Sequence, residues 1–292
     1  MKQNSSAGGG LLIKNLLLVG GDQRALRLET LLISRGYQVA TWGLRTGDGD
    51  PDAVRAADAL LFPYPYAVKG GKVPALTERR PAPEAALEMA AKNALVLAGH
   101  GLEGYVMREN SHGKGLRLSL YERHEPFLQT NAEISAEAAV YEAMGLGEET
   151  VAGRTALVTG YGRFGQALAK RLLGLGATVW VAARREKQRL SASADGMRAL
   201  PLDCLPEIAP ELSVVLNTIP AQVLADKTLE RLPKRCVLLE LAGAPGGFDP
   251  AEAERAGLRW VRLPGLPARY APLSAARAMM GACEKLLTEA ET

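Results

Sequence analysis

The chain has 292 residues, of which 47% are hydrophobic and 23% are charged, as in ordinary soluble globular proteins. A net charge of +3 with both signs interspersed, together with only 5% aromatic residues, argues against binding of nucleic acid or of an anionic membrane. No apolar stretch reaches the roughly 20 residues that cross a bilayer, and we expect a cytoplasmic protein. The length of the whole chain favours two domains.

The first half of the chain alternates short apolar runs with stretches of helical periodicity. Residues 1–10 predict a flexible tail, because they are polar and glycine-rich. The predicted strands are 16–19, 37–41, 59–62 and 94–97, and the predicted helices cover 26–35 and 82–89. This alternation predicts a parallel sheet covered by helices on both faces, which forms a substrate-side domain of residues 11–132.

Residues 134–144 then show helical periodicity, and Ser135 stands where a side chain could cap the start of that helix. We expect residues 133–150 to form a bridging helix and linker. The second half repeats the pattern, with predicted strands at 155–159, 178–182, 214–217, 237–241 and 258–262. The fold class is therefore α/β, with two Rossmann-like, doubly wound parallel-sheet domains. The second spans 151–273, and a C-terminal helix within 274–292 crosses back to the first, by analogy with two-domain dehydrogenases.

Gly160, Gly162 and Gly165 form a G-x-G-x-x-G pattern between a predicted strand and a predicted helix. The first glycine permits a tight turn, the second lets backbone approach a pyrophosphate, and the third allows close packing of helix and strand. The helix start offers free N–H groups and a partial positive charge. The alternative is a glycine-rich turn that binds nothing. We predict that the turn binds a dinucleotide through Gly160, Tyr161, Gly162, Arg163, Phe164 and Gly165.

The end of the next predicted strand indicates which dinucleotide binds. An NAD site usually carries an Asp or Glu there for the ribose hydroxyls. This chain instead has Arg184 and Arg185, followed by Lys187 and Arg189. Because a guanidinium suits a 2′-phosphate and cannot replace a carboxylate acceptor, we predict NADP rather than NAD. A solvated basic helix start is the alternative.

Further loops follow strands of the same sheet, and ligands of open parallel sheets lie beyond the carboxyl ends of the strands. We expect these loops to flank the ribose and the nicotinamide. The residues concerned are Asn217, Thr218, Ile219, Pro220, Glu240, Ala242 and Gly265.

Several stretches together resemble the family of dipicolinate synthase A subunits. They are VGGDQR at 19–24, NAEISAEAAV at 131–140, GYGRFGQALAKRLLGLGATVWVAARR at 160–185, NTIP at 217–220, LLELAGAPGGFD at 238–249 and RLPGLPARYAPLSAARAM at 262–279. The resemblance implies oxidation of dihydrodipicolinate, or its hydrated precursor, to dipicolinate with a nicotinamide cofactor. It also implies that the partner is the flavoprotein-like B subunit of dipicolinate synthase, in the mother cell of a spore-forming bacterium.

A flat dicarboxylate substrate requires cationic or hydrogen-bonding partners, and its oxidation releases a proton. The substrate-binding candidates are Arg24, Asn131, Ser135 and Tyr270. Glu137, Glu240 or water would accept the proton. Each residue also has a structural interpretation: a surface arginine at a helix start, a helix cap, an ion-paired glutamate or a packed tyrosine.

One position departs from the resemblance. Family members carry APKTA near the end, whereas this chain has Leu273 in place of the lysine. A leucine offers no cation to a substrate carboxylate. Either the lysine is therefore less important than the resemblance implies, or the substrate of this chain is a different one. The alternatives are a dehydrogenase for another small acid or a folate derivative, and a non-catalytic NADP-binding subunit. Homo-oligomerisation is left open.

The three histidines, His100, His112 and His124, lie in one region of the chain. Their spacing matches no compact metal motif, so we expect no metal site. All three have the context of surface or loop residues. His124, between Arg123 and Glu125, is the one that we single out as a site candidate.

Overall fold

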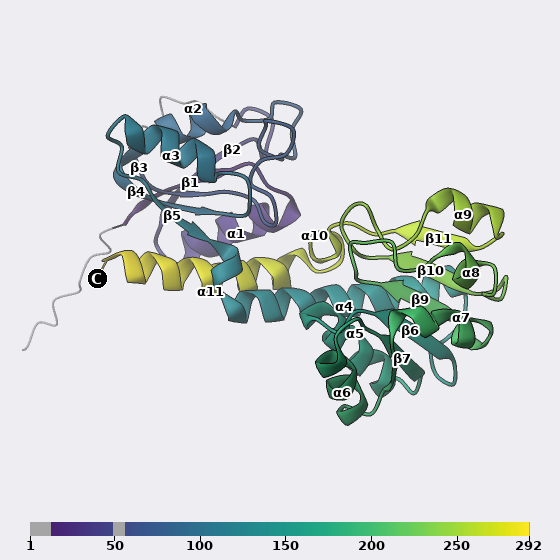
Figure 1. Cartoon of the computed structure of the whole chain (residues 1–292). Coiled ribbons are helices and arrows are strands. Elements are labelled where there is room, and N and C mark those ends of the chain that lie inside the picture. Colours follow the sequence, from purple (N-terminus) through teal and green to yellow (C-terminus); the bar gives the residue numbers. More distant parts are fainter. Residues whose placement is uncertain (1–12, 49–55, 292) are drawn as a thin grey trace, which may run out of the picture. The chain divides into compact units, whose positions relative to one another are not determined.

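The computed structural model describes residues 13–48 and 56–291, so the predicted tail lies outside the described residues. The chain divides into two compact units. Unit 1 comprises the residues up to Leu128 together with those from Pro272 onward, and unit 2 is Gln129–Ala271. Each unit holds one sheet of parallel strands with helices between them (Figure 1). The predicted fold class of two doubly wound parallel-sheet domains is confirmed.

Unit 1 has a five-stranded sheet in the order β2-β1-β3-β4-β5, in which the strand order reverses between β1 and β3. Its elements are β1 (Asn15–Val19), α1 (Gln23–Ser34), β2 (Gln38–Trp42), β3 (Ala57–Leu61), α2 (Pro83–Glu88), β4 (Ala90–Ala98), α3 (Glu103–Ser111), β5 (Arg117–Leu120), the 3₁₀ turn Tyr121–Arg123 and α11 (Pro272–Glu291).

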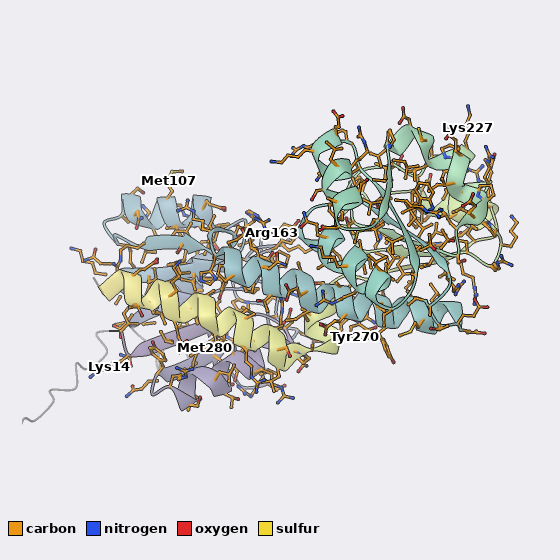
Figure 2. All side chains as sticks on the ribbon, turned by 90° about the horizontal axis from the view of Figure 1, so that it is seen from below. Lys14, Met107, Arg163, Lys227, Tyr270 and Met280 are labelled. Carbon is orange, nitrogen blue, oxygen red and sulfur yellow. The ribbon has the colours of Figure 1, made fainter. Side chains whose placement is uncertain are left out.

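The last helix completes the core of unit 1. Leu28 and Leu32 of α1 are buried in one cluster with Met279, Met280 and Leu287 of α11. Figure 1 shows α11 in yellow beside α1 in purple, and Figure 2 labels Met280 on it. The opposite face of the sheet is covered by apolar residues of α2 and α3. The chain therefore returns to unit 1 for its final helix.

Unit 2 has a six-stranded sheet in the order β11-β10-β9-β6-β7-β8, which reverses between β6 and β9. Its elements are β6 (Thr155–Thr159), α5 (Arg163–Gly174), β7 (Thr178–Ala182), α6 (Glu186–Ala194), β8 (Arg198–Leu200), a 3₁₀ turn (Leu202–Cys204), α7 (Leu205–Ile208), a 3₁₀ turn (Ala209–Glu211), β9 (Val214–Asn217), α8 (Asp226–Leu229), β10 (Val237–Glu240), α9 (Pro250–Arg255), β11 (Arg259–Arg262) and α10 (Leu266–Tyr270). Helices α4 and α5 cover one face of this sheet, and α7 to α9 cover the other.

Helix α4 (Glu125–Gly147) is longer than the predicted 134–144 and belongs to unit 1 at its start and to unit 2 beyond it. It begins after His124, whose Nδ1 accepts a hydrogen bond from the backbone N of Phe127 at 3.2 Å. Ser135 therefore lies in mid-helix, and its Oγ donates to the carbonyl of Asn131 at 2.7 Å. The interpretation of Ser135 as a cap was wrong, because the helix already starts at Glu125. No described helix is long and apolar enough to cross a membrane.

Candidate functional site

A cavity of about 700 Å³ lies at the carboxyl ends of β6, β7 and β9, a size that suits a cofactor. Eleven of the fourteen predicted cofactor residues line it, namely 160–165, Arg184, Arg185 and 218–220. Gln188, Leu202, Ala221 and Val223 also line it and were not predicted. Parallel pairing of the three strands brings these separate segments to one edge of the sheet.

The glycine turn leaves room for a phosphate group at the start of α5. Gly160 has a φ of +84°, which favours glycine. A Cβ on Gly165 would lie 2.3 Å from the carbonyl oxygen of Gly160, so any side chain there would push the helix away from the turn. Around a Cβ on Gly162, by contrast, no atom lies within 4 Å. The open space at Gly162 faces the first N–H groups of α5, which begins at Arg163 (labelled in Figure 2).

The side chain of Tyr161 supports the glycine turn. Its side chain is buried, and its hydroxyl donates to Oδ2 of Asp195 at 2.7 Å, while Lys170 pairs with the same oxygen at 3.2 Å. Burial, followed by the bond to Asp195, raises the pKa of Tyr161. The hydroxyl of Tyr161, followed by Lys170, lowers the pKa of Asp195. The ring of Tyr161 therefore supports the turn rather than contacting a ligand.

The Tyr161→Phe variant is expected to change the acid dependence of stability. Because the pKa of Asp195 is depressed in the folded state, its ion pair and hydrogen bond stabilise the fold above the unfolded value of about 3.9. That contribution is lost as pH falls through the lower, folded pKa. Urea unfolding at pH 7 and at successively lower pH should show a smaller acid-linked loss in the variant than in the wild type. Tyr141→Phe, at an exposed tyrosine of unit 2, should leave the profile unchanged.

The lining contains three arginines and no carboxylate among the described residues. Arg189 does not reach the cavity, because its Nη1 donates to the carbonyls of Ala183 and Arg184 at 2.9 and 2.8 Å. It thereby fixes the backbone at the end of β7. Arg184 and Arg185 are exposed and make no ion pair within the described chain. Two free guanidinium groups thus stand where an NAD site would carry its acid.

Three buried polar side chains join the ends of β6, β9 and β10. Asn217 donates from Nδ2 to Oε1 of Glu240 at 2.8 Å, and its Oδ1 accepts from the hydroxyl of Thr159. Glu240 is fully buried and accepts from the backbone N of Ala242 at 2.9 Å and of Gly247 at 2.6 Å. Asn217 and Glu240 do not line the cavity. They are occupied by donors and acceptors of the chain itself, and they hold the loops that follow their strands.

Two further predicted cofactor residues also lie outside the cavity lining. Ala242 is half-buried in the loop held by Glu240, and Gly265 has a φ of +68° at the start of α10.

Among the predicted substrate residues, Arg24 lies at the start of α1 beside the reversal of strand order in unit 1. Its guanidinium donates from Nη2 to Asp22 at 2.7 Å and to the carbonyl of Tyr64 at 2.6 Å. The side chain is only 8% exposed, so the interpretation as a surface arginine was wrong. The cavity beside it, of about 20 Å³, has room for little more than a water molecule.

The other candidates lie in unit 2 and do not line its large cavity. Asn131 is half-buried, and its Oδ1 has no hydrogen-bond partner among the described residues. Glu137 is exposed and pairs with Arg171 at 3.0 Å. Tyr270 packs against Tyr141, with ring centroids 5.6 Å apart. Leu273 lies instead in unit 1, in the first turn of α11, and is exposed.

The expected surface or loop context of His124 was wrong. Its ring is buried, burial lowers its pKa, and its Nδ1 is bonded to the start of α4. His112 ends α3 at the surface. In the described part of the chain, no three His, Cys, Asp or Glu side chains gather as metal ligands.

Comparison with known proteins places this geometry among dehydrogenases. Residues 119–245 match the family model described as D-isomer specific 2-hydroxyacid dehydrogenase, NAD binding domain. The dipicolinate synthase A subunit of Bacillus subtilis (strain 168) is 25% identical over 94% of this chain and 96% of that protein. The chain resembles the dipicolinate synthase A subunit. This confirms the resemblance seen in the motifs, and the matched domain indicates a nicotinamide cofactor and a dehydrogenase-type role.

Solved structures agree on the fold. The crystal structure of the dipicolinate synthase A subunit from Bacillus halodurans has a TM-score of 0.81 and 24% identity, covering 95% of this chain and 98% of that one. A transhydrogenase from Sinorhizobium meliloti has a TM-score of 0.64 and 18% identity, covering 94% and 96%. The likeness therefore extends over both units of the fold.

Proposed function

We propose that this chain is a dipicolinate synthase A subunit, which oxidises dihydrodipicolinate, or its hydrated precursor, to dipicolinate with NADP⁺. The observation that carries the proposal is the cavity at the glycine turn, which among the described residues is lined by arginines and by no carboxylate, in a chain that resembles these proteins over nearly its whole length. The flavoprotein-like B subunit is the proposed partner, and the mother cell of a spore-forming bacterium is the proposed location.

In this proposal, different parts of the cavity bind different groups of the cofactor. The backbone at Gly162 and the start of α5 would hold the pyrophosphate, and Arg184 and Arg185 would bind the 2′-phosphate. The nicotinamide ring, when bound, supplies the acceptor for a hydride. Aromatisation of the pyridine ring favours the reaction, so the protein has mainly to position the substrate and to accept a proton.

The test is turnover by the purified chain. Dihydrodipicolinate and NADP⁺ should give an increase in absorbance at the NADPH band with the chain alone, or when the flavoprotein-like partner is added. Mixtures without substrate and mixtures with NAD⁺ serve as controls. Reaction only with hydroxy acids or folates would show that the chain is a dehydrogenase for a different substrate. Binding of NADP⁺ without turnover in every mixture would indicate a non-catalytic role.

A further inference from the structure

Residues 218–223, here called the β9 wall, follow strand β9 and form one side of the cofactor cavity in unit 2. Five of these six residues line the cavity, namely 218–221 and Val223. None of the six lies in a helix or a strand, and the middle of the segment, 220–222, is exposed. The contacts at its two ends therefore decide where the wall stands.

The first end of the β9 wall is held through the side chain of Asn217. Its Nδ2 donates to the carbonyl of Ile219 at 2.9 Å and to Oε1 of Glu240 at 2.8 Å. Its Oδ1 accepts from the backbone N of Ile219 at 3.2 Å and from the hydroxyl of Thr159. Because both donors and both acceptor positions of the amide are used, its orientation is fixed. The bond to Glu240 therefore helps to set the position of Ile219.

The second end of the β9 wall is held through the backbone of Gly247. Its N donates to Oε2 of Glu240 at 2.6 Å, and its carbonyl accepts from the N of Val223 at 2.9 Å and of Leu224 at 2.8 Å. A Cβ at Gly247 would lie 2.3 Å from Cγ of Asn217, so this loop packs directly on the amide that holds the first end. The two oxygens of one carboxylate thus tie both ends of the wall.

The arrangement requires an acceptor at both oxygens of residue 240. The carboxylate of Glu240 receives three donors, from Nδ2 of Asn217 and from the backbone N of Ala242 and Gly247. A glutamine has one oxygen and one NH₂ group, so a donor would face a donor at one of the two ends. Glu240 is fully buried and does not line the cavity. It can therefore act on a bound cofactor only through the wall.

The order of strands decides which half of a dinucleotide meets the β9 wall. Strand β6 lies between β7 and β9. In the proposed binding mode, the pyrophosphate lies at the glycine turn after β6, and the 2′-phosphate lies at Arg184 and Arg185 after β7. The remaining half, which carries the nicotinamide, therefore extends across the end of β9. The wall is also joined to the strand before the glycine turn, since Oγ1 of Thr218 donates to the carbonyl of Thr159 at 2.6 Å.

We propose that Glu240 is a positioning residue for hydride transfer. Its carboxylate fixes both ends of the β9 wall, and the wall holds the nicotinamide half of NADP in the cavity. The inference rests on the proposed function for the cofactor, whereas all the contacts that carry it lie within unit 2. In this role Glu240 touches neither the cofactor nor the substrate and accepts no proton from them.

Binding of the whole coenzyme and of its adenosine half tests the role. Glu240→Gln is expected to bind NADPH about 10-fold more weakly than the wild type, which is the equivalent of about one hydrogen bond. Adenosine 2′,5′-bisphosphate carries the 2′-phosphate but no nicotinamide, and its affinities for the two proteins should agree within about threefold. The measurement is calorimetric titration of the full chain, at a temperature where circular dichroism shows every variant to be folded.

Two control variants separate positioning from stability. Leu258→Ala truncates a buried side chain that does not line the cavity, so it should be less stable than the wild type but bind both ligands equally well. Glu254→Gln, at an exposed glutamate of α9, should change neither stability nor binding. Equal weakening of both ligands in Glu240→Gln, or unchanged affinity for both, would overturn the inference.

Turnover distinguishes this inference from the proposed function. With saturating NADP⁺, kcat of Glu240→Gln for dihydrodipicolinate should fall about 10- to 100-fold, because a displaced nicotinamide loses the geometry of hydride transfer. If the wild type has no turnover but the two ligands respond differently to Glu240→Gln, the proposed reaction fails and the positioning role stands. If the wild type and Glu240→Gln turn over equally, the inference is wrong and the proposed function stands.

Discussion

Replacement of Glu240 by alanine is expected to lower the free energy of unfolding by about 3 kcal/mol or more. The change removes the acceptor for Nδ2 of Asn217 and for the backbone N of Ala242 and Gly247, and it does so at a fully buried position. Buried donors left without partners cost about 1–3 kcal/mol each, although neighbouring losses do not add fully. Urea unfolding of the full chain measures the effect.

The comparison variants separate the network from general surface effects. Glu240→Gln retains one carbonyl oxygen but turns an amide donor toward one of the existing donors, so its loss should be smaller than that of alanine. Glu254→Ala, at an exposed residue of α9, should stay within about 0.5 kcal/mol of wild type. Equal stability of Glu240→Ala and wild type would show that the three strand ends are held by other contacts.

The Arg184→Ala/Arg185→Ala double variant is expected to bind NADP⁺ about 100-fold more weakly, with NAD⁺ affinity changed less than threefold. Each guanidinium would contribute one charge-assisted hydrogen bond to the 2′-phosphate, and a loss of about 1.4 kcal/mol corresponds to a factor of ten. The measurement is a pair of coenzyme titrations at fixed ionic strength, because exposed charges are screened by salt.

Lys187→Ala is the matched control for this double variant. Lys187 is an exposed cation of the same basic run but does not line the cavity. Its removal should change NADP⁺ affinity only slightly. Equal affinity of the wild-type chain for NADP⁺ and NAD⁺ would contradict the cofactor assignment.

The parts of the site that could be predicted from the sequence are those formed by consecutive residues. The glycine turn at 160–165 and the basic residues after β7 were recognisable because a strand, a tight turn and a helix start follow one another without interruption. The same holds for most strands of both sheets, whose apolar runs are buried on two faces.

Residues that meet only through tertiary pairing were missed or misread. The contact of His100 with Glu122 joins residues that are separated by helix α3 and strand β5, and both elements went unpredicted, because neither carries a strong apolar period. Leu202 reaches the cofactor cavity from a 3₁₀ turn after the short, unpredicted strand β8. For Glu240 the sequence left both a proton acceptor and an ion-paired residue open, since nothing in its neighbours reveals that the backbone amides of two separate loop positions converge on its carboxylate.

The return of the chain to unit 1 has a consequence for biosynthesis. Leu28 and Leu32 share their buried cluster with Met279 and Leu287, which the ribosome adds after all of unit 2 has been made. Unit 2 is a continuous segment of the chain. It can therefore complete its fold before unit 1, although its synthesis starts later. A nascent chain truncated before residue 272 should therefore contain a protease-resistant second half and an amino-terminal half whose apolar surface is still open to chaperones.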